Sequence, residues 1–419
     1  MGKLAWSILA AAVLCCFGCA GGSSEGDPEL DPRFLTELSA TGLASGDSFG
    51  SSVAIDGDYA IVGCPYEDAG GLGDSGAAYV YERSGSGWVQ VAKLSASDAA
   101  AYAYFGSSVG ISGEYAIVGA YYASTETVSN CGAAYIFERS EGTWAQAAKL
   151  LASEGAPGDS FGRSVAIDGD RAMIGAPYED AGELGDCGAA YVYERSGSGW
   201  VQAVKLSASD AAPGACFGSS GCIGGEYAIV GAPYMDTETV SNCGAAYVFS
   251  RSGETWAQAA KLTADDAGAD DNLGSSVAIA GNRALVGASW ADASAEIEDA
   301  GAAYVFERSG AAWPQKAKLR ASDAAGYDRF GCSVALRGGC ALVGAPKIKS
   351  AYTGGAYLFV LSDGAWSQLL KLTAAGGGEA DDWYGYSVAL SEEGGIIGVP
   401  RALDASEART GGAELWSLY

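Results

Sequence analysis

The chain has 419 residues, including 63 glycines and no histidine, and its acidic side chains give it a formal charge of −27 at pH 7. This charge excludes nucleic-acid binding, because phosphate recognition needs clustered lysine and arginine. The absence of histidine excludes Ser-His-Asp and Cys-His catalysis and removes the commonest zinc ligand. We therefore expect a protein that is not an enzyme and that holds no cofactor or catalytic metal.

The N-terminus predicts export from a bacterial cell. A single lysine precedes an apolar run that ends near Phe17, and small residues follow around Cys19. This order is typical of a secretion signal, and the run is short for a membrane span. Because the segment before Cys19 resembles a lipoprotein processing site, we expect 1–19 to be a signal peptide with lipid on Cys19. Plain cleavage after Ala20 is the alternative. Residues 20–32 then form a flexible tether on a secreted or cell-surface lipoprotein.

The rest of the chain, 33–419, consists of seven repeats. Each repeat opens with Phe-Gly or a variant and continues with Gly-Ala-Pro or a variant. A Gly-Ala-Ala-Tyr-Val-Tyr-like segment follows and, in six repeats, Trp-x-Gln-x-x-Lys-Leu. A regular period of this kind is typical of propellers and solenoids. The repeats open at Phe49-Gly50, Phe105-Gly106, Phe161-Gly162, Phe217-Gly218, Leu273-Gly274, Phe330-Gly331 and Tyr384-Gly385.

Each repeat predicts four short antiparallel strands, A to D. In repeat 1 these are 51–56, 59–64, 76–82 and 88–95. Asp56-Gly57-Asp58 between strands A and B is a tight hairpin turn. Small residues in strand A and aromatic residues in strands C and D suit a propeller blade, whose inner strand is crowded near the axis. The sequence therefore predicts an all-β, seven-bladed β-propeller.

The two ends of the chain predict how the ring closes. Repeat 7 stops after its strand C, near Leu415, and has no strand D. An orphan strand at the start of the propeller carries Leu38, which lies eleven residues before Phe49, as Leu94 lies eleven before Phe105. We therefore expect this N-terminal strand to complete the last blade and to remove the edges that an open array would leave exposed.

These motifs resemble the FG-GAP repeats of the integrin alpha-chain propeller, and most closely the bacterial FG-GAP variety of secreted and surface proteins. The resemblance covers about residues 34–419. It implies a seven-bladed propeller whose D–A and B–C loops form the ligand-binding face. Integrin-type repeats carry calcium in some A–B loops, but here that place holds only short turns such as Asp56-Gly57-Asp58. Such turns are too short to supply six to eight oxygen ligands, so calcium is not expected in them.

The loops of repeats 6 and 7 combine basic and aromatic side chains on an otherwise acidic protein. Such a corner is suited to an anionic group or a sugar, because the cations can pair with a negative charge and the aromatic rings can stack on the apolar face of a sugar ring. Ordinary loop variation is the alternative. The candidate ligand-binding residues are Lys347, Lys349, Tyr352, Trp383, Arg401 and Arg409.

The B–C loops of repeats 1 and 3 are acidic and are flanked by acidic D–A loops. They are candidates for a cation-binding patch on the same face, and solvated loop carboxylates are the alternative. The candidate residues are Glu67, Asp68 and Asp74 in repeat 1 and Glu179, Asp180, Glu183 and Asp186 in repeat 3.

Two further residue series have structural interpretations. The tryptophans of strand D, from Trp88 to Trp366, hold a fixed place in the repeat and are expected to pack within the ring. Eight cysteines remain beyond the N-terminal segment, from Cys64 to Cys340. Their even number is compatible with disulfides in an exported protein, and isolated buried thiols are the alternative.

The residues favour a non-enzymatic extracellular module that binds a protein or a glycan, as in adhesion, and the resemblance implies that it does so through its D–A and B–C loops. The alternative is a structural component of the cell surface without a discrete ligand. The only membrane contact expected is the tether through Cys19.

Overall fold

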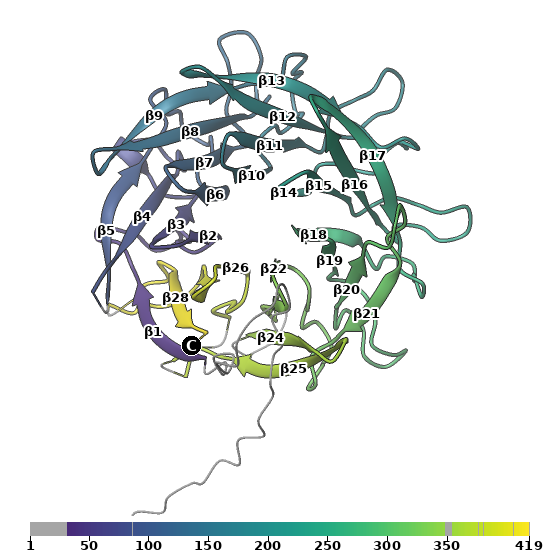
Figure 1. Ribbon diagram of the computed structural model, residues 1–419. Helices are drawn as coiled ribbons and strands as arrows, with labels where there is room; N and C mark the ends of the chain where they lie inside the picture. Colours follow the sequence, from purple (N-terminus) through teal and green to yellow (C-terminus); the bar gives the residue numbers. More distant parts are fainter. Residues whose placement is uncertain are drawn as a thin grey trace, which may run out of the picture.

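The computed structural model describes residues 32–418, except 86, 348–353, 376, 380 and 405. They form seven four-stranded antiparallel sheets arranged around one axis, which confirms the predicted seven-bladed β-propeller (Figure 1). The predicted signal peptide, with Cys19, and residues 20–31 of the predicted tether lie outside the described residues. Within the described part of the chain, no helix is long and apolar enough to cross a membrane.

The first four blades have the same strand order, with strand A nearest the axis. Blade 1 contains β2 (Ser52–Asp56), β3 (Tyr59–Cys64), β4 (Ala77–Ser84) and β5 (Gly87–Leu94). Blade 2 contains β6 (Ser108–Ser112), β7 (Tyr115–Ala120), β8 (Ala133–Ser140) and β9 (Thr143–Leu150). Blade 3 contains β10 (Ser164–Asp168), β11 (Arg171–Ala176), β12 (Ala189–Ser196) and β13 (Gly199–Leu206). Blade 4 contains β14 (Ser220–Gly224), β15 (Tyr227–Ala232), β16 (Ala245–Ser252) and β17 (Thr255–Leu262).

The last three blades complete the ring. Blade 5 contains β18 (Leu273–Ala280), β19 (Arg283–Ala288), β20 (Ala302–Glu307) and β21 (Gln315–Leu319). Blade 6 contains β22 (Val334–Arg337), β23 (Cys340–Ala345), β24 (Gly355–Ser362) and β25 (Ala365–Leu372). Blade 7 contains β26 (Ser387–Leu390), β27 (Gly394–Val399), β28 (Gly412–Ser417) and β1 (Arg33–Leu38). A single-turn 3-10 helix, η1 (Ala69–Gly71), lies in the B–C loop of blade 1.

The closure of the ring follows the prediction. Strand β1 pairs antiparallel with β28, in the order β1-β28-β27-β26, so the start of the propeller supplies the outer strand of blade 7. Leu38 lies opposite Ala413 and is buried in the core between blades 7 and 1. A second link lies near the axis, where the Ser387 hydroxyl donates a hydrogen bond of 2.8 Å to the Gly50 carbonyl.

The Phe-Gly pairs hold neighbouring blades together. Phe49 is fully buried and meets Tyr79 edge-to-face at 5.6 Å between ring centroids, a geometry that contributes about 1 kcal/mol beyond burial alone. Gly50 has a φ of +93°, and a Cβ at this position would lie 2.1 Å from the carbonyl oxygen of Gly412 in blade 7. Only glycine therefore allows this contact between blades.

Blade 7 differs from the others at its outer edge. Glu37 and Glu414 lie directly opposite each other on β1 and β28, where blade 1 has Lys93 opposite Tyr79. Desolvation raises the pKa of both carboxyls, and the charge of Glu37 raises that of Glu414 further. Since the folded-state pKa of Glu414 lies above its ordinary value, its contribution to stability is greatest at low pH and falls as the pH rises through that pKa.

We expect Glu37→Lys to stabilise the propeller at neutral pH by roughly 1 kcal/mol, because it replaces a like-charge cross-strand pair with an attractive one. Chemical denaturation of the variant and of the unmodified protein measures the difference. Glu126→Lys, in an exposed loop of blade 2, is the control for net charge. The gain should exceed that of the control at pH 7 and disappear at a pH that protonates Glu414. An equal gain from both variants would contradict it.

The eight cysteines of the propeller are all free thiols, so the structure favours isolated thiols over disulfides. Six of them are buried, and Cys222 and Cys332 are partly buried. Burial raises the pKa of Cys216 to about 11 and that of Cys332 to about 12, which keeps both thiols protonated at neutral pH.

We expect these thiols to react slowly with a thiol-specific alkylating reagent in the folded protein and completely in denaturant. Peptide mass spectrometry after alkylation measures both. A disulfide-linked pair of peptides from the propeller, or a thermal midpoint lowered by reducing agent, would contradict the prediction.

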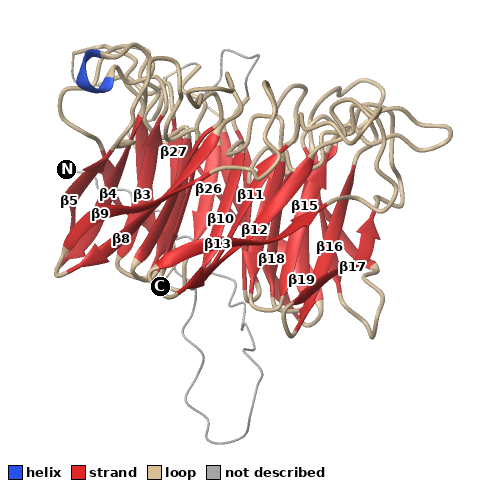
Figure 2. Ribbon diagram, turned by 90° about the horizontal axis from the view of Figure 1, so that it is seen from above, coloured by secondary structure: helices blue, strands red, loops and turns tan. Residues whose placement is uncertain are grey.

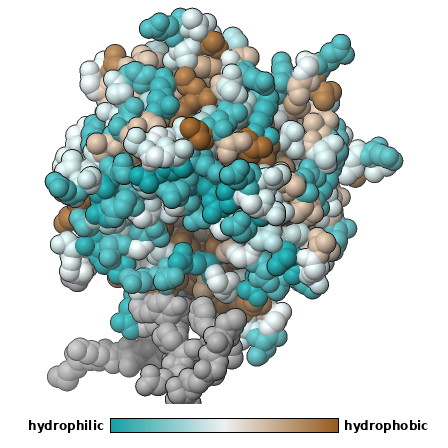
Figure 3. All heavy atoms as spheres, turned by 45° about the horizontal axis from the view of Figure 1, so that its top comes forward, coloured by the Kyte–Doolittle hydropathy of each residue, from teal (hydrophilic) through white to brown (hydrophobic). Residues whose placement is uncertain are grey.

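The exterior of the propeller is mainly polar, in keeping with its acidic composition. From the side shown in Figure 3, hydrophilic residues dominate and apolar side chains form small separate patches. The larger apolar side chains are mostly buried between blades, in clusters that combine residues of adjacent blades. The surface features that distinguish one blade from another therefore lie in the loops.

Candidate functional site: the D–A and B–C loop face

The D–A and B–C loops lie together on one face of the propeller, and the short A–B and C–D hairpins lie on the other (Figure 2). Main-chain hydrogen bonds join each B–C loop to the D–A loop that leads into the next blade. In blade 1, the Ser75 carbonyl accepts from the Phe105 amide at 3.0 Å, and the Gly73 carbonyl accepts from the Tyr102 amide at 2.8 Å. The loop face is therefore a continuous surface of paired loops.

The residue before each Phe-Gly pair has a positive φ in all seven blades, although none of the seven is glycine. Their φ values lie between 52° and 61°. This left-handed conformation costs an L-residue about 1–2 kcal/mol, and glycine would remove that cost. Each blade therefore keeps a side chain on the loop face at some expense in backbone energy. The seven residues are Ser48, Tyr104, Ser160, Cys216, Asn272, Arg329 and Trp383.

The residue that follows strand B and its Gly-Ala-Pro sequence is an exposed aromatic in blades 1 to 5. We call these five residues the aromatic belt. Their exposed fractions lie between 42% and 45%, and exposed aromatic side chains that recur on one face can form a binding surface. Blades 6 and 7 have the cations Lys347 and Arg401 at the same place. The belt consists of Tyr66, Tyr122, Tyr178, Tyr234 and Trp290.

A tyrosine of the D–A loop, Tyr104, joins members of the belt at blades 1 and 2. Tyr104 meets Tyr66 and Tyr122 edge-to-face, at 5.4 Å between centroids in each case. It also stacks on Tyr121 at 5.6 Å, and the Arg163 guanidinium lies 5.2 Å from the centroid of Tyr121. These contacts fix the rings in place, so that they form a rigid apolar platform with one cation beside it.

Two arginine–tryptophan contacts lie on the same face at blades 5 to 7. The Arg329 guanidinium carbon lies 3.3 Å from the centroid of Trp290, and Arg401 lies 4.7 Å from that of Trp383. Trp383 also stacks on Tyr386 at 5.7 Å with an interplanar angle of 20°. Cation–π contacts of this kind contribute about 0.5–2 kcal/mol and present charge and ring together.

The structure brings part of the predicted basic and aromatic corner together. Arg401 and Trp383 are in contact, and Arg409 donates to the Arg401 carbonyl at 2.9 Å and pairs with Asp382 at 3.4 Å. Lys347 forms an ion pair of 3.1 Å with the buried carboxylate of Asp328. The other two predicted residues, Lys349 and Tyr352, lie outside the described residues. Ligand binding by this corner stays a prediction.

The acidic residues of the B–C loops have partners within the chain. Glu67 is buried, accepts a hydrogen bond of 2.6 Å from the Tyr79 hydroxyl, and forms an ion pair with Lys93. Glu179 has the same contacts in blade 3, with Tyr191 and Lys205.

The neighbouring aspartates stabilise their own loops. Asp68 accepts the amide of Asp74 at 2.9 Å, and Asp180 accepts that of Asp186 at 2.8 Å. The part of the chain that the structure describes contains no group of three or more His, Cys, Asp or Glu side chains arranged to hold a metal ion. Cation binding by these loops stays a prediction.

In blades 2, 4, 5 and 6 a D–A loop aspartate takes the place of Glu67. In blade 2, Asp98 accepts from Tyr135 at 3.0 Å and from Lys149 at 2.5 Å. Partial burial alone would raise the pKa of Asp98, but these hydrogen bonds outweigh it, so the pKa lies below its ordinary value. A tyrosine–lysine–carboxylate contact therefore attaches a loop to the outer strands in six blades.

We expect Glu67→Gln to destabilise the protein by about 1–3 kcal/mol, because it removes the buried negative charge that pairs with Lys93 and accepts the Tyr79 hydrogen bond. Asp68→Asn, the adjacent control, keeps an oxygen acceptor for Asp74 in an exposed loop and should cost much less. Chemical denaturation measures both. Equal small effects would show that Glu67 is a solvated loop carboxylate and contradict the assignment.

The aromatic belt was not among the sites predicted from the sequence. The residues were visible, since tyrosine or tryptophan follows the Gly-Ala-Pro position in five repeats, but in a strand-rich repeat an aromatic residue is usually core. These rings are exposed because strand B ends on the loop face and each ring directly follows that end, which only the three-dimensional arrangement shows. The strand D tryptophans, by contrast, do pack within the ring as expected: Trp144 meets Tyr59 edge-to-face at 6.1 Å.

Comparison with known proteins supports the repeat architecture. A profile of the FG-GAP repeat matches seven segments, at residues 33–81, 88–137, 144–193, 200–249, 256–306, 313–359 and 366–413. No curated protein sequence matches the chain. Among solved structures, the chain is similar to a periplasmic gluconolactonase of Pseudomonas aeruginosa, PpgL, with a TM-score of 0.51 and 17% sequence identity over 79% of this chain and 87% of that one. At this identity the similarity concerns the fold alone.

Proposed function

We propose, given that this chain belongs to the FG-GAP repeat family, that it is a non-enzymatic extracellular binding module. Its ligand is a glycan or a protein at the cell surface, and the D–A and B–C loop face is the binding surface. The observation that carries this proposal is the aromatic belt, together with the Arg401–Trp383 contact, on the face where the blades differ most from one another.

The chemistry of the belt suits recognition. Tyrosine and tryptophan offer large, stiff contact areas at a low cost in side-chain entropy, and they are enriched where binding energy is concentrated. Arg401 adds a partly exposed cation beside Trp383 on an acidic protein, so an anionic or polar group of a ligand has a defined place to bind beside an aromatic ring, whereas Arg329 is buried and paired with Asp299.

A catalytic role has less support. With no histidine in the sequence, proton transfer near neutral pH would depend on side chains whose ordinary pKa lies far from 7. The similarity to a gluconolactonase brings no activity with it, because it extends only to the arrangement of blades. Export through the predicted signal peptide and lipid on Cys19 complete the proposal for a cell-surface location.

The test is a binding screen of the purified protein against glycan and extracellular-protein arrays, with and without calcium. For any ligand found, Trp290→Ala and Trp383→Ala should each weaken binding at least about tenfold, as expected for central aromatic contacts. Val201→Ala is the control, since Val201 is exposed on the outer strand of blade 3, away from the loop face. Binding that these variants leave unchanged, or the absence of any ligand, would favour the structural alternative.

A further inference from the structure

A tyrosine at the start of strand B occupies the same kind of place between several pairs of blades. Tyr59 of blade 1 meets Trp144 of blade 2 edge-to-face at 6.1 Å, and the Arg139 guanidinium lies 4.3 Å from its ring centroid. Its hydroxyl donates a hydrogen bond to Glu82 on the adjacent strand. We call the set formed by the tryptophan, the arginine and the cross-strand residue the tyrosine cradle.

The same cradle recurs at the next junction. Tyr115 meets Trp200 at 5.7 Å, lies 5.4 Å from Arg195, and donates to Glu138 at 3.0 Å. Between blades 4 and 5, Tyr227 has an equivalent tryptophan at 5.6 Å and an equivalent arginine at 5.6 Å. The tyrosine cradle thus holds a tyrosine ring at three junctions between neighbouring blades.

Between blades 7 and 1 the cradle lacks its tyrosine. The register of β27 with β28 places Gly394 opposite Ser417, as Tyr59 lies opposite Glu82 in blade 1. Trp88 and Arg83 of blade 1 are still present on the other side. A pocket of about 340 Å³ lies here, lined by Trp88, Arg83 and Ser417 together with the apolar side chains of Leu35, Ile55 and Leu415.

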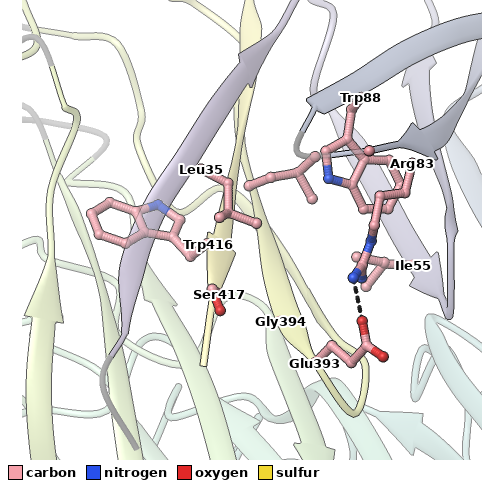
Figure 4. A pocket seen from close by; sticks show the side chains of 10 residues that line it. Leu35, Ile55, Arg83, Trp88, Glu393, Gly394, Trp416 and Ser417 are labelled. Carbon is pink, nitrogen blue, oxygen red and sulfur yellow. Dashed lines mark ion pairs between the residues drawn. The ribbon is translucent and has the colours of Figure 1, made fainter. Parts of the chain in front are cut away.

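The close-up view shows how the pocket is built. Leu35 lies on one side and Trp88 with Arg83 on the other, while the ring of Trp416 points away (Figure 4). Arg83 lies over the Trp88 ring at 5.4 Å and forms an ion pair with Glu393. The space exceeds the roughly 150 Å³ of a cavity that binds benzene, so an aromatic ring fits.

We infer that this pocket binds a tyrosine side chain of a partner protein, in the place that the chain's own tyrosines take at three of the other six junctions. In the three filled cradles a tyrosine ring packs against the tryptophan and the arginine that correspond to Trp88 and Arg83. The site lies by the A–B and C–D hairpins, on the side opposite the loop face, so it is independent of the proposed function.

The charges around the pocket define the partner further. Asp58 and Glu393 pair with Arg83 at the rim, and their side chains are 66% and 60% exposed. On a chain of net charge −27, these carboxylates favour a tyrosine that has lysine or arginine beside it. The partner is thus a protein that presents a tyrosine flanked by basic residues.

The test uses the purified full-length protein and three capped tripeptides, Lys-Tyr-Lys, Lys-Ala-Lys and Glu-Tyr-Glu, titrated by NMR or calorimetry. Lys-Tyr-Lys should bind with a Kd on the order of 1 mM, as suits a single side chain, and the other two at least about tenfold more weakly. Equal affinity for Lys-Tyr-Lys and Lys-Ala-Lys would overturn the proposal.

A matched pair of variants tests whether Lys-Tyr-Lys binds in the pocket between blades 7 and 1. Leu35→Trp fills the pocket from β1 and should weaken Lys-Tyr-Lys binding at least about tenfold. Val91→Trp, at the equivalent exposed position of β5, lies beside a cradle that Tyr59 already fills and should leave binding unchanged. An equal effect of both variants, or of neither, would overturn the assignment.

A second measurement tests the cradle itself. Tyr59→Ala opens a similar space between blades 1 and 2, and p-cresol, the analogue of the tyrosine side chain, should raise the thermal midpoint of this variant more than that of Tyr122→Ala in the aromatic belt. No difference would overturn the inference from the filled cradles. If a chain shortened to end at Leu418 binds Lys-Tyr-Lys and the full chain does not, Tyr419 is the occupant and the proposal of a partner protein is overturned.

Discussion

The pairing of β1 with β28 is the contact on which the rest of the structure depends. Without it, blade 7 would expose an edge strand, and the apolar core that Leu38 and Leu415 share with blade 1 would be open to water. A ring of blades is rigid only when it is closed, because each blade packs only on its two neighbours. Once β1 is in place, every inner strand has the same surroundings, and seven pairs of loops are presented on one face.

Within the closed ring, the repeat separates scaffold from surface. The Phe-Gly pair, the tyrosine–lysine–carboxylate contacts and the strand D tryptophans serve packing and loop attachment, so nearly the same residues recur from blade to blade. Two positions on the loop side change freely: the residue before the Phe-Gly pair, from Ser48 to Trp383, and the residue after strand B, from Tyr66 to Arg401. The first is buried in four blades, and the second is exposed in blades 1 to 5. Variation is therefore concentrated where a ligand would touch the protein.

The junction of blades 7 and 1 departs from the repeat because its outer strand comes from the other end of the chain. β1 has no hairpin to β28, so its residues do not need to match those of a C–D hairpin. Glu37 stands where the other blades have lysine, and Gly394 stands where they have tyrosine, arginine or, in blade 6, cysteine. The first change leaves two carboxyls face to face, and the second leaves an open pocket. The closure of the ring is thus also the place where the protein differs most from its own pattern.

The sequence determined the fold, the number of blades and the closure, because packing around an axis imposes the same residue types at every turn and those types are visible as a repeat. The B strand of blade 1 was predicted at the bounds that the structure has, and the other strands of that blade within two residues. What the tertiary structure decided was which side chains of that repeat are exposed. Tyr79 and Tyr66 are both tyrosines at fixed places, yet one binds Glu67 in the interior and the other belongs to the aromatic belt. In the acidic loops, likewise, only the tertiary structure places Lys93 and Tyr79 beside Glu67. Burial depends on neighbours that are distant along the chain, such as Gly394 and Trp88 across the closure. The pattern of adjacent residues in the sequence therefore does not show which side chains are buried.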